Sequence, residues 1–237
     1  MRVYADLHLC PPLDDVPNAR SMASVLGELQ IEVVGLVVPP DKIAATPPAI
    51  LAFKDAGLDV AKRLDLSPRS REELLRNLRK FRSKYEIIGV DCSSLSVSRV
   101  AVRDHRVDIV QFPKQKSRSA FRRNLAGTCR AALEFSMSEL TQPAGFEGRL
   151  YGMRREIEVA AGASTRVIGC TSASSSLELR APRDVAAILH ILGLSPEAAL
   201  RAVSEIPLAI VKENRLRMEE PQLEEGVRIV RRSVHHE

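Results

Sequence analysis

The residues with the most distinctive chemistry lie within the first ten positions. Val3-Tyr4-Ala5-Asp6-Leu7-His8-Leu9-Cys10 reads as an apolar strand that carries Asp6, His8 and Cys10 at every second position. Because alternate side chains of a strand point the same way, we expect these three side chains to share one face. A carboxylate, an imidazole and a thiolate are all metal ligands, so the segment has the composition of one half of a metal site.

The rest of the sequence does not complete that site. Phosphoesterases that hold divalent metals often begin with this layout, but with a second His at the position of Cys10. The other histidines are His105, His190, His235 and His236, and none falls where a partner ligand is needed. We therefore expect a metallo-hydrolase scaffold that no longer holds its metals. On this interpretation the chain has no catalytic residue, no metal ligand and no cofactor of its own.

Two metal-dependent alternatives stay open. Zinc binds thiolates and imidazole, and the available ligands would be Cys10, Cys92, Cys170 and His8. Isolated cysteines are more often core residues, which favours a structural role for these thiols. A phosphoesterase that binds manganese or magnesium could instead use carboxylates, and its residues would be Asp6, His8, Asp91 and Glu134.

Short apolar runs alternate with helical patterns along the chain. Strands that alternate with helices predict βαβ units and a parallel sheet, and seven or eight such units favour a TIM-like α/β barrel with outer helices. The predicted strands are 3–7, 33–38, 58–64, 87–91, 107–112, 132–135 and 166–170.

Helix starts are marked by capping residues. Ser70 and Glu73 form a capping-box pattern, and Ser195 followed by Pro196 is a typical N-cap. The alternation of strands and helices stops after Lys212. We therefore expect one barrel domain over residues 1–212 and a C-terminal helical extension or frayed tail over residues 213–237.

Composition indicates an ordinary globular chain. It has 237 residues, of which 45% are hydrophobic and 27% charged, and no apolar run is long enough to cross a membrane. Arg2 leads directly into the first strand, so we expect no signal peptide. The four cysteines form no Cys-x-x-Cys pair, which favours a reducing, cytoplasmic location and excludes a zinc ribbon.

Positive charge is concentrated in the middle of the chain. Residues 99–130 contain nine Lys or Arg against two Asp, and such a concentration favours a polyanionic partner over a solvated basic face without a ligand. Aromatic residues make up 4% and Trp is absent, so recognition of RNA by backbone and shape is expected to dominate over base stacking. The residues predicted to bind RNA here are Arg99, Arg103, Arg106, Lys114, Lys116, Arg118, Arg122 and Arg123.

A hydroxyl-rich segment, Thr171-Ser172-Ala173-Ser174-Ser175-Ser176, follows the last predicted strand. Loops at this position of a barrel often hold a phosphate. Serine-rich loops are also common turn sequences, and a flexible loop that leads to the next helix is the favoured interpretation.

Four segments together resemble protein component 3 of archaeal ribonuclease P. Their order and spacing carry the resemblance, which runs from about residue 1 to about residue 212. The segments are Tyr4-Ala5-Asp6-Leu7-His8, Asp108-Ile109-Val110-Gln111-Phe112, Leu133-Glu134-Phe135-Ser136 and Leu177-Glu178-Leu179-Arg180-Ala181-Pro182-Arg183-Asp184.

The resemblance implies a barrel related to metal-dependent phosphoesterases that lacks their complete metal site. It implies a protein subunit of a ribonucleoprotein that removes the 5′ leader of precursor tRNA, in which the RNA subunit hydrolyses the phosphodiester with bound magnesium. The expected partners are ribonuclease P RNA, component 2 and other protein subunits, with precursor tRNA contacted indirectly and no membrane.

The resemblance also assigns motif positions. Asp6 and His8 match the family's first-strand motif, and Arg180 and Asp184 match the motif before its late helices. We expect Asp6 and Asp184 to be structural, as acceptors for loop and helix-start N–H groups. Arg180 is expected either to bind RNA or to brace the loop.

Overall fold

The computed structural model describes residues 2–43, 46–112, 120–141, 145–219, 222–224 and 227–228. The strands are β1 Tyr4–Leu9, β2 Ile31–Val37, β3 Asp59–Leu66, β4 Ile87–Asp91, β5 Ile109–Gln111, β6 Ala132–Ser136, β7 Val167–Cys170, β8 Gln222–Glu224 and β9 Val227–Arg228. The helices are α1 Val16–Glu28, α2 Pro48–Asp55, α3 Arg71–Phe81, α4 Leu95–Ala101, α5 Arg123–Ala126, α6 Ser138–Thr141, α7 Phe146–Gly162, the 3-10 helix η1 Ser176–Glu178, α8 Pro182–Ile191, α9 Pro196–Arg201 and α10 Glu205–Glu219.

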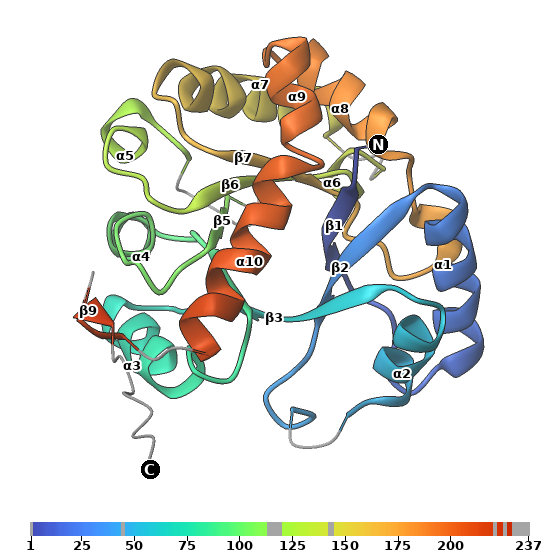
Figure 1. Cartoon of the computed structure of the whole chain (residues 1–237). Helices are drawn as coiled ribbons and strands as arrows, with labels where there is room; N and C mark the ends of the chain where they lie inside the picture. The colour runs from blue at the N-terminus through green and yellow to red at the C-terminus, as the bar shows by residue number, and fades with distance from the viewer. Residues whose placement is uncertain are drawn as a thin grey trace, which may run out of the picture.

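The seven strands β1 to β7 form one sheet in the order of the sequence, and every neighbouring pair is parallel. Each strand predicted from the sequence overlaps one of them. The sheet curls into a nearly closed barrel with helices around its outside (Figure 1). The predicted TIM-like α/β barrel is therefore confirmed.

The gap between β1 and β7 is closed by two connecting segments rather than by an eighth strand. The Ala5 N–H of β1 donates to the Val203 carbonyl at 3.1 Å, and the Gly169 N–H of β7 donates to the Ala202 carbonyl at 3.0 Å. Nearer the carboxyl ends of the strands, the Cys10 N–H donates to the Ala173 carbonyl at 2.8 Å. These bonds satisfy edge groups that would otherwise lack partners in a barrel of seven strands.

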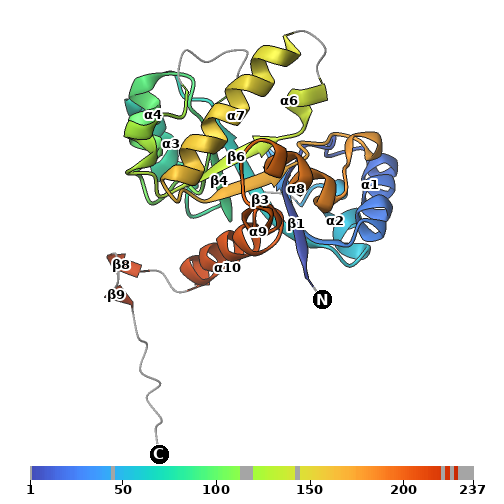
Figure 2. The ribbon, with the colours of Figure 1, turned by 90° about the horizontal axis from the view of Figure 1, so that it is seen from above.

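The barrel has an inner and an outer apolar core. The outer core fills the space between the strands and the surrounding helices. The inner cluster is made of small and aliphatic side chains from all seven strands, together with Ile210 and Val211 of α10. Helix α10 thereby closes the end of the barrel at which β1 begins, opposite the end that carries α6 (Figure 2).

Polar contacts hold α10 against the strand ends. The guanidinium of Arg215 donates two hydrogen bonds of 2.7 Å to the Asp59 carboxylate and one of 2.6 Å to the Glu86 carboxylate. The Asn214 amide donates to the Glu86 carbonyl at 2.7 Å. Helix α10 runs past residue 212, where we placed the end of the barrel domain, so the division into domain and tail stays a prediction.

The predicted helix starts are confirmed with one change in detail. The Ser70 hydroxyl accepts from the Glu73 N–H at 3.2 Å, and the Ser195 hydroxyl accepts from the Ala198 N–H at 3.2 Å. The Glu73 carboxylate accepts from the N–H of Arg69, rather than from that of Ser70, at 2.8 Å. In the part of the chain that the structure describes, no helix is long and apolar enough to cross a membrane.

The first prediction concerns Gly89 of β4, which faces the barrel interior. A Cβ there would lie 2.2 Å from Asp65 Oδ1, and Asp65 is held in place by its 2.8 Å hydrogen bond from Arg63. We expect Gly89→Ala to lower the free energy of unfolding by about 1–3 kcal/mol, because the methyl group overpacks a fixed ion pair. Urea denaturation measures this change.

Gly27→Ala in α1 is the matched control for that substitution. The added methyl meets no atom within 4 Å, and Ala is the better helix former, so stability should stay equal or rise. Equal stability of the two variants would contradict the close approach at Gly89.

Candidate functional site

An ion pair without solvent contact lies inside the barrel. Arg63 and Glu134 stand two positions beyond Ala61 and Ala132 of the inner apolar cluster, so they point into the barrel one layer nearer the carboxyl ends of the strands. Both side chains are fully buried, and Arg63 Nη1 lies 2.7 Å from Glu134 Oε2. Arg63 Nη1 also donates to the Leu7 carbonyl at 3.0 Å.

His8 and Asp65 complete a group of four charges, which we call the mouth cluster: His8, Arg63, Asp65 and Glu134. His8 Nδ1 lies 2.5 Å from Glu134 Oε1, and His8 Nε2 lies 3.3 Å from Asp65 Oδ2. Arg63 Nε donates to Asp65 Oδ1 at 2.8 Å. Each cation therefore contacts both carboxylates.

The mouth cluster determines the protonation of its members. Burial and the Arg63 charge oppose protonation of His8, but Glu134 and the hydrogen bonds of the ring outweigh them and raise the pKa of His8 to about 10. Burial alone would raise the pKa of Glu134, but Arg63 and His8 lower that pKa to about 2. His8 is therefore an imidazolium at neutral pH, and two cations balance two carboxylates. Buried charges persist when they are paired in this way.

Asp6 joins β1 to the loop after β7. Its carboxylate accepts from the Thr171 N–H and the His8 N–H, each at 3.1 Å, and from the Thr171 hydroxyl at 2.5 Å. Burial raises the pKa of Asp6 against the effect of these bonds. The expected structural role of Asp6 is confirmed.

These residues do not fit a resident metal ion. Among the described residues, no group of three or more His, Cys, Asp or Glu side chains is placed to hold one. Both carboxylates nearest His8 are already neutralised by Arg63 and by His8 itself, so a divalent cation would compete with two fixed positive charges. The Asp91 carboxylate instead accepts from the Ser67 hydroxyl.

The thiols do not form a zinc site either. Cys170 belongs to the inner cluster, whereas Cys92 belongs to the outer core, on the other side of the sheet. Burial raises the pKa of both thiols well above the usual range, which disfavours the thiolate that zinc needs. The prediction that these cysteines are core residues is confirmed for Cys92 and Cys170.

A serine nucleophile is disfavoured at the same place. The Ser172 hydroxyl lies 3.0 Å from His8 Nδ1, which superficially resembles a nucleophile next to its base. A general base must be unprotonated, but both ring nitrogens of His8 face carboxylates and the pKa is about 10. The Ser172 hydroxyl also accepts from the Ser136 hydroxyl at 2.7 Å.

The hydroxyl-rich loop 171–176 is occupied by its own partners. The Glu178 carboxylate accepts from the N–H and the hydroxyl of Ser174 at 2.6 and 2.9 Å. The Ser176 hydroxyl accepts from the Ser21 hydroxyl of α1 at 3.0 Å. A carboxylate thus takes the donors that a phosphate would use. The observed contacts describe a loop fixed to α1 rather than a flexible one.

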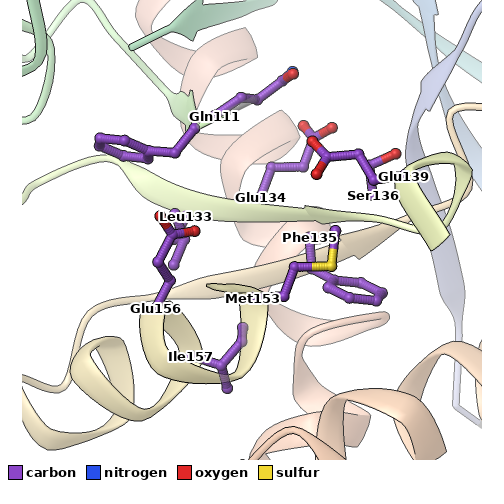
Figure 3. Close-up of a pocket in the computed structure, with 10 residues that line it drawn as sticks. Gln111, Leu133, Glu134, Phe135, Ser136, Glu139, Met153, Glu156 and Ile157 are labelled. Atoms are coloured by element: carbon purple, nitrogen blue, oxygen red, sulfur yellow. The ribbon is translucent and has the colours of Figure 1, made fainter. Parts of the chain in front are cut away.

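A small pocket lies beside the mouth cluster between β6 and α7 (Figure 3). Its volume of about 20 Å³ has room for one water molecule. Glu134 and Ser136 lie on one side of β6, whereas Leu133 and Phe135 lie on the side that faces α7 (Figure 3). This pocket is therefore too small for a substrate.

The predicted RNA-binding residues separate into distinct groups. The side chains of Arg99, Arg122 and Arg123 are exposed and have no hydrogen bond or ion pair with a described residue, whereas the Arg103 side chain donates to the Thr128 hydroxyl at 3.1 Å. Arg106 is neutralised by a two-pronged pair with Asp104, at 2.8 and 2.6 Å. The remaining predicted residues, Lys114, Lys116 and Arg118, lie outside the described residues.

Of the two residues in the late motif, Arg180 makes structural contacts and Asp184 makes no cap at its helix start. Arg180 Nη1 donates to the carbonyls of Leu177 and Leu179 at 2.8 and 2.6 Å, so it braces the loop. Asp184 lies exposed in the first turn of α8, and no side-chain cap is formed at that helix start. The expected N–H acceptor role of Asp184 is therefore wrong, because Ala181 occupies the cap position and Asp184 lies inside the first turn of the helix.

Sequence reasoning missed Arg63. The signal was the order Ala61, Arg63, Asp65, in which a basic and an acidic residue occupy the inward positions of an otherwise buried strand. An arginine next to Lys62 looks like a surface residue until the inward face of β3 is known.

Comparison with known proteins now assigns the chain to a family. The family model described as RNase P subunit p30 matches residues 3–219. The chain belongs to the RNase P subunit p30 family. Ribonuclease P protein component 3 of Methanosarcina mazei is 25% identical over 214 residues, which cover 88% of each protein. The stated resemblance to component 3 is thus confirmed.

Solved structures agree on the fold of this p30 family member. A chain of the cryo-EM structure of archaeal ribonuclease P with mature tRNA has a TM-score of 0.77 and 21% identity, and the match covers 96% of this chain and 98% of that one. A crystal structure of an amidohydrolase has a TM-score of 0.53 and 12% identity, with 90% and 74% covered. At these identities the likeness concerns the fold alone.

The second prediction removes the buried guanidinium of this p30 family member. Arg63→Met leaves Glu134 and Asp65 without one of their two cations inside the barrel. We expect the free energy of unfolding to fall by about 3–5 kcal/mol, because two carboxylates then share His8 as their single cation and one buried negative charge is left uncompensated. Urea denaturation at neutral pH gives the value.

The double variant Arg63→Met, Glu134→Gln is the control for charge. Removing both charges should recover part of the lost unfolding free energy, because His8 and Asp65 then remain as a balanced pair. A double variant that loses the sum of both single effects would count against the ion pair.

The third prediction concerns pH. His8 is protonated in the folded state up to about pH 10, whereas unfolded His titrates near its ordinary pKa of 6.5. The stabilisation from His8 is therefore complete below pH 6.5 and is lost as pH rises toward 10. The difference in unfolding free energy between the native protein and His8→Gln should shrink over that range. A difference that does not change with pH would show that His8 is neutral in the folded state.

Proposed function

We propose that this chain is a non-catalytic protein subunit of ribonuclease P, which supports RNA-catalysed removal of the 5′ leader from precursor tRNA. The observation that carries the proposal is the match of the p30 family model to residues 3–219. Its curated relatives bear the name ribonuclease P protein component 3.

The barrel mouth supports a non-catalytic role. The mouth cluster uses its own cations to neutralise the carboxylates that a hydrolase would use for metal binding. His8 is protonated and so is not available as a base. The mechanism we propose is therefore binding: Lys and Arg neutralise RNA phosphates and release counterions, so that affinity falls with salt.

The partners follow from the same proposal. The chain binds ribonuclease P RNA and component 2 together with other protein subunits, and it contacts precursor tRNA indirectly. Magnesium acts through the RNA subunit, and the protein works in the cytoplasm. One solved structure of similar fold is a chain of an archaeal ribonuclease P with mature tRNA, which supports an RNA-containing assembly.

Reconstitution tests this proposal directly. Precursor-tRNA cleavage by an archaeal ribonuclease P RNA is measured at limiting magnesium, with and without this chain and component 2. We expect the chain to raise the rate or lower the magnesium requirement. No effect, combined with manganese-dependent phosphodiester hydrolysis by the chain alone, would refute the proposal.

The fourth prediction concerns two exposed arginines. The double substitution Arg122→Gln, Arg123→Gln should weaken binding to ribonuclease P RNA and reduce the slope of log affinity against log salt by about 1.4–1.8, because two phosphate contacts are lost. Filter binding over a salt series measures both quantities.

Arg20→Gln, Lys54→Gln is the matched control, because it removes the same charge from exposed positions on α1 and α2. An equal change in slope for both double variants would mean that only net charge matters. No change in either would favour a basic face that is merely solvated.

A further inference from the structure

Helix α7 carries both exposed aromatic side chains of the chain. The sequence has three Tyr, six Phe and no Trp, and all of them lie among the described residues. Seven of these nine rings are buried in the cores. The other two are Tyr151, which is 68% exposed, and Phe146, which is 43% exposed. An exposed aromatic ring on an ordered helix offers a flat apolar face on which a ligand can pack.

Tyr151 lies in line with a groove between α5 and α7. The groove is lined from α7 by Arg155, Glu158, Val159 and Gly162, which recur at helical spacing, and Tyr151 extends that stripe by one turn. From the α5 side the groove is lined by Arg122 and Arg123, and its volume is about 800 Å³. It is therefore an open channel rather than an enclosed cavity.

Three guanidinium groups in this groove are available for a ligand. The side chains of Arg122, Arg123 and Arg155 are exposed and have no hydrogen bond or ion pair with a described residue. The carboxylate in the groove, that of Glu158, accepts from Arg154 Nε at 2.9 Å and so is already paired. The groove thus carries an uncompensated positive charge that attracts an anion.

The two walls of the groove are fixed to each other. The Phe121 N–H, one residue before Arg122, donates to the buried Glu156 carboxylate of α7 at 3.0 Å. The Phe121 ring is buried and packs edge-on against Phe112 at 5.6 Å between centroids. The backbone that carries Arg122 is therefore held against α7 before any ligand binds, which lowers the entropic cost of binding.

We propose that the groove between α5 and α7 binds single-stranded RNA, with the phosphates against Arg122, Arg123 and Arg155 and a base stacked on Tyr151. An aromatic face next to a basic channel is the arrangement that suits an unpaired strand, because every base offers a flat face for stacking. Duplex RNA hides its bases and offers Tyr151 no such face. This inference rests on the proposed function and adds a site and a strand type to it.

The test uses a short fluorescein-labelled oligouridylate and the full-length protein, with fluorescence anisotropy over a salt series. Tyr151→Ala should weaken binding about tenfold without changing the salt slope, because stacking involves no counterion. Tyr151→Phe keeps the ring and should bind like the native protein. Arg155→Gln should lower the slope by about 0.7, the value for one phosphate contact on a single strand.

Arg20→Gln is the control, since it removes one exposed positive charge from α1, on the opposite side of the barrel from α5 (Figure 1). It should leave both affinity and slope nearly unchanged. A duplex of the same length should compete more weakly than the single strand.

The outcomes separate this inference from the proposed function. Unchanged oligouridylate binding by both Tyr151→Ala and Arg155→Gln would overturn the groove site, while binding of the native protein to ribonuclease P RNA would leave the subunit proposal standing. Binding of ribonuclease P RNA without any binding of oligouridylate would have the same meaning. Failure of the native protein to bind either RNA would overturn both.

Discussion

The fully buried ion pair between Arg63 and Glu134 is the contact on which the barrel depends. It places two opposite charges in the interior, where an apolar layer would otherwise continue. The desolvation free energy of these charges is offset only if every charge nearby has a partner. That requirement explains His8 and Asp65 as the second pair, and it explains why β4 carries Gly89 beside them. The inward positions near the carboxyl-terminal ends of β1, β3 and β6 are thereby occupied by charges that neutralise one another.

The exposed arginines to which we assign binding lie on the outer wall of the barrel. In barrel enzymes the loops after the strands carry the reacting groups, but here the loop after β7 is tied to α1 and to its own Glu178. Among the predicted RNA-binding residues that the structure describes, the side chains without a partner are Arg99 of α4 and Arg122 and Arg123 at α5, and Arg155 of α7 lines the same groove as the last two. On the proposed function, the fold binds its partner through its side, as expected when function depends on the residues grafted on a fold.

Local sequence patterns were sufficient to predict the strands and helices, but the mouth cluster depends on contacts between residues far apart in the sequence. The seven apolar runs were sufficient for the strands because each lies between helix-forming stretches with clear caps at Ser70 and Ser195. The partner of Arg63 is on β6, and no spacing rule connects the two positions. Charge counting treated Arg106 and Arg122 alike, although one is paired with Asp104 and the other is free. The low aromatic content led us to expect little base stacking, and composition alone gives no sign that Tyr151 is exposed.

The closure of the barrel by residues 202 and 203 has a consequence for how the chain reaches its fold. During synthesis from the amino terminus, β1 is made first, but the carbonyl that accepts from Ala5 and the side chains that fill the barrel end from α10 are made nearly last. Until they emerge from the ribosome, β1 and β7 both carry unpaired edges above an open apolar interior. Such edges are templates for pairing with other chains. Chains that end before α10 are therefore expected to aggregate rather than to form a smaller barrel.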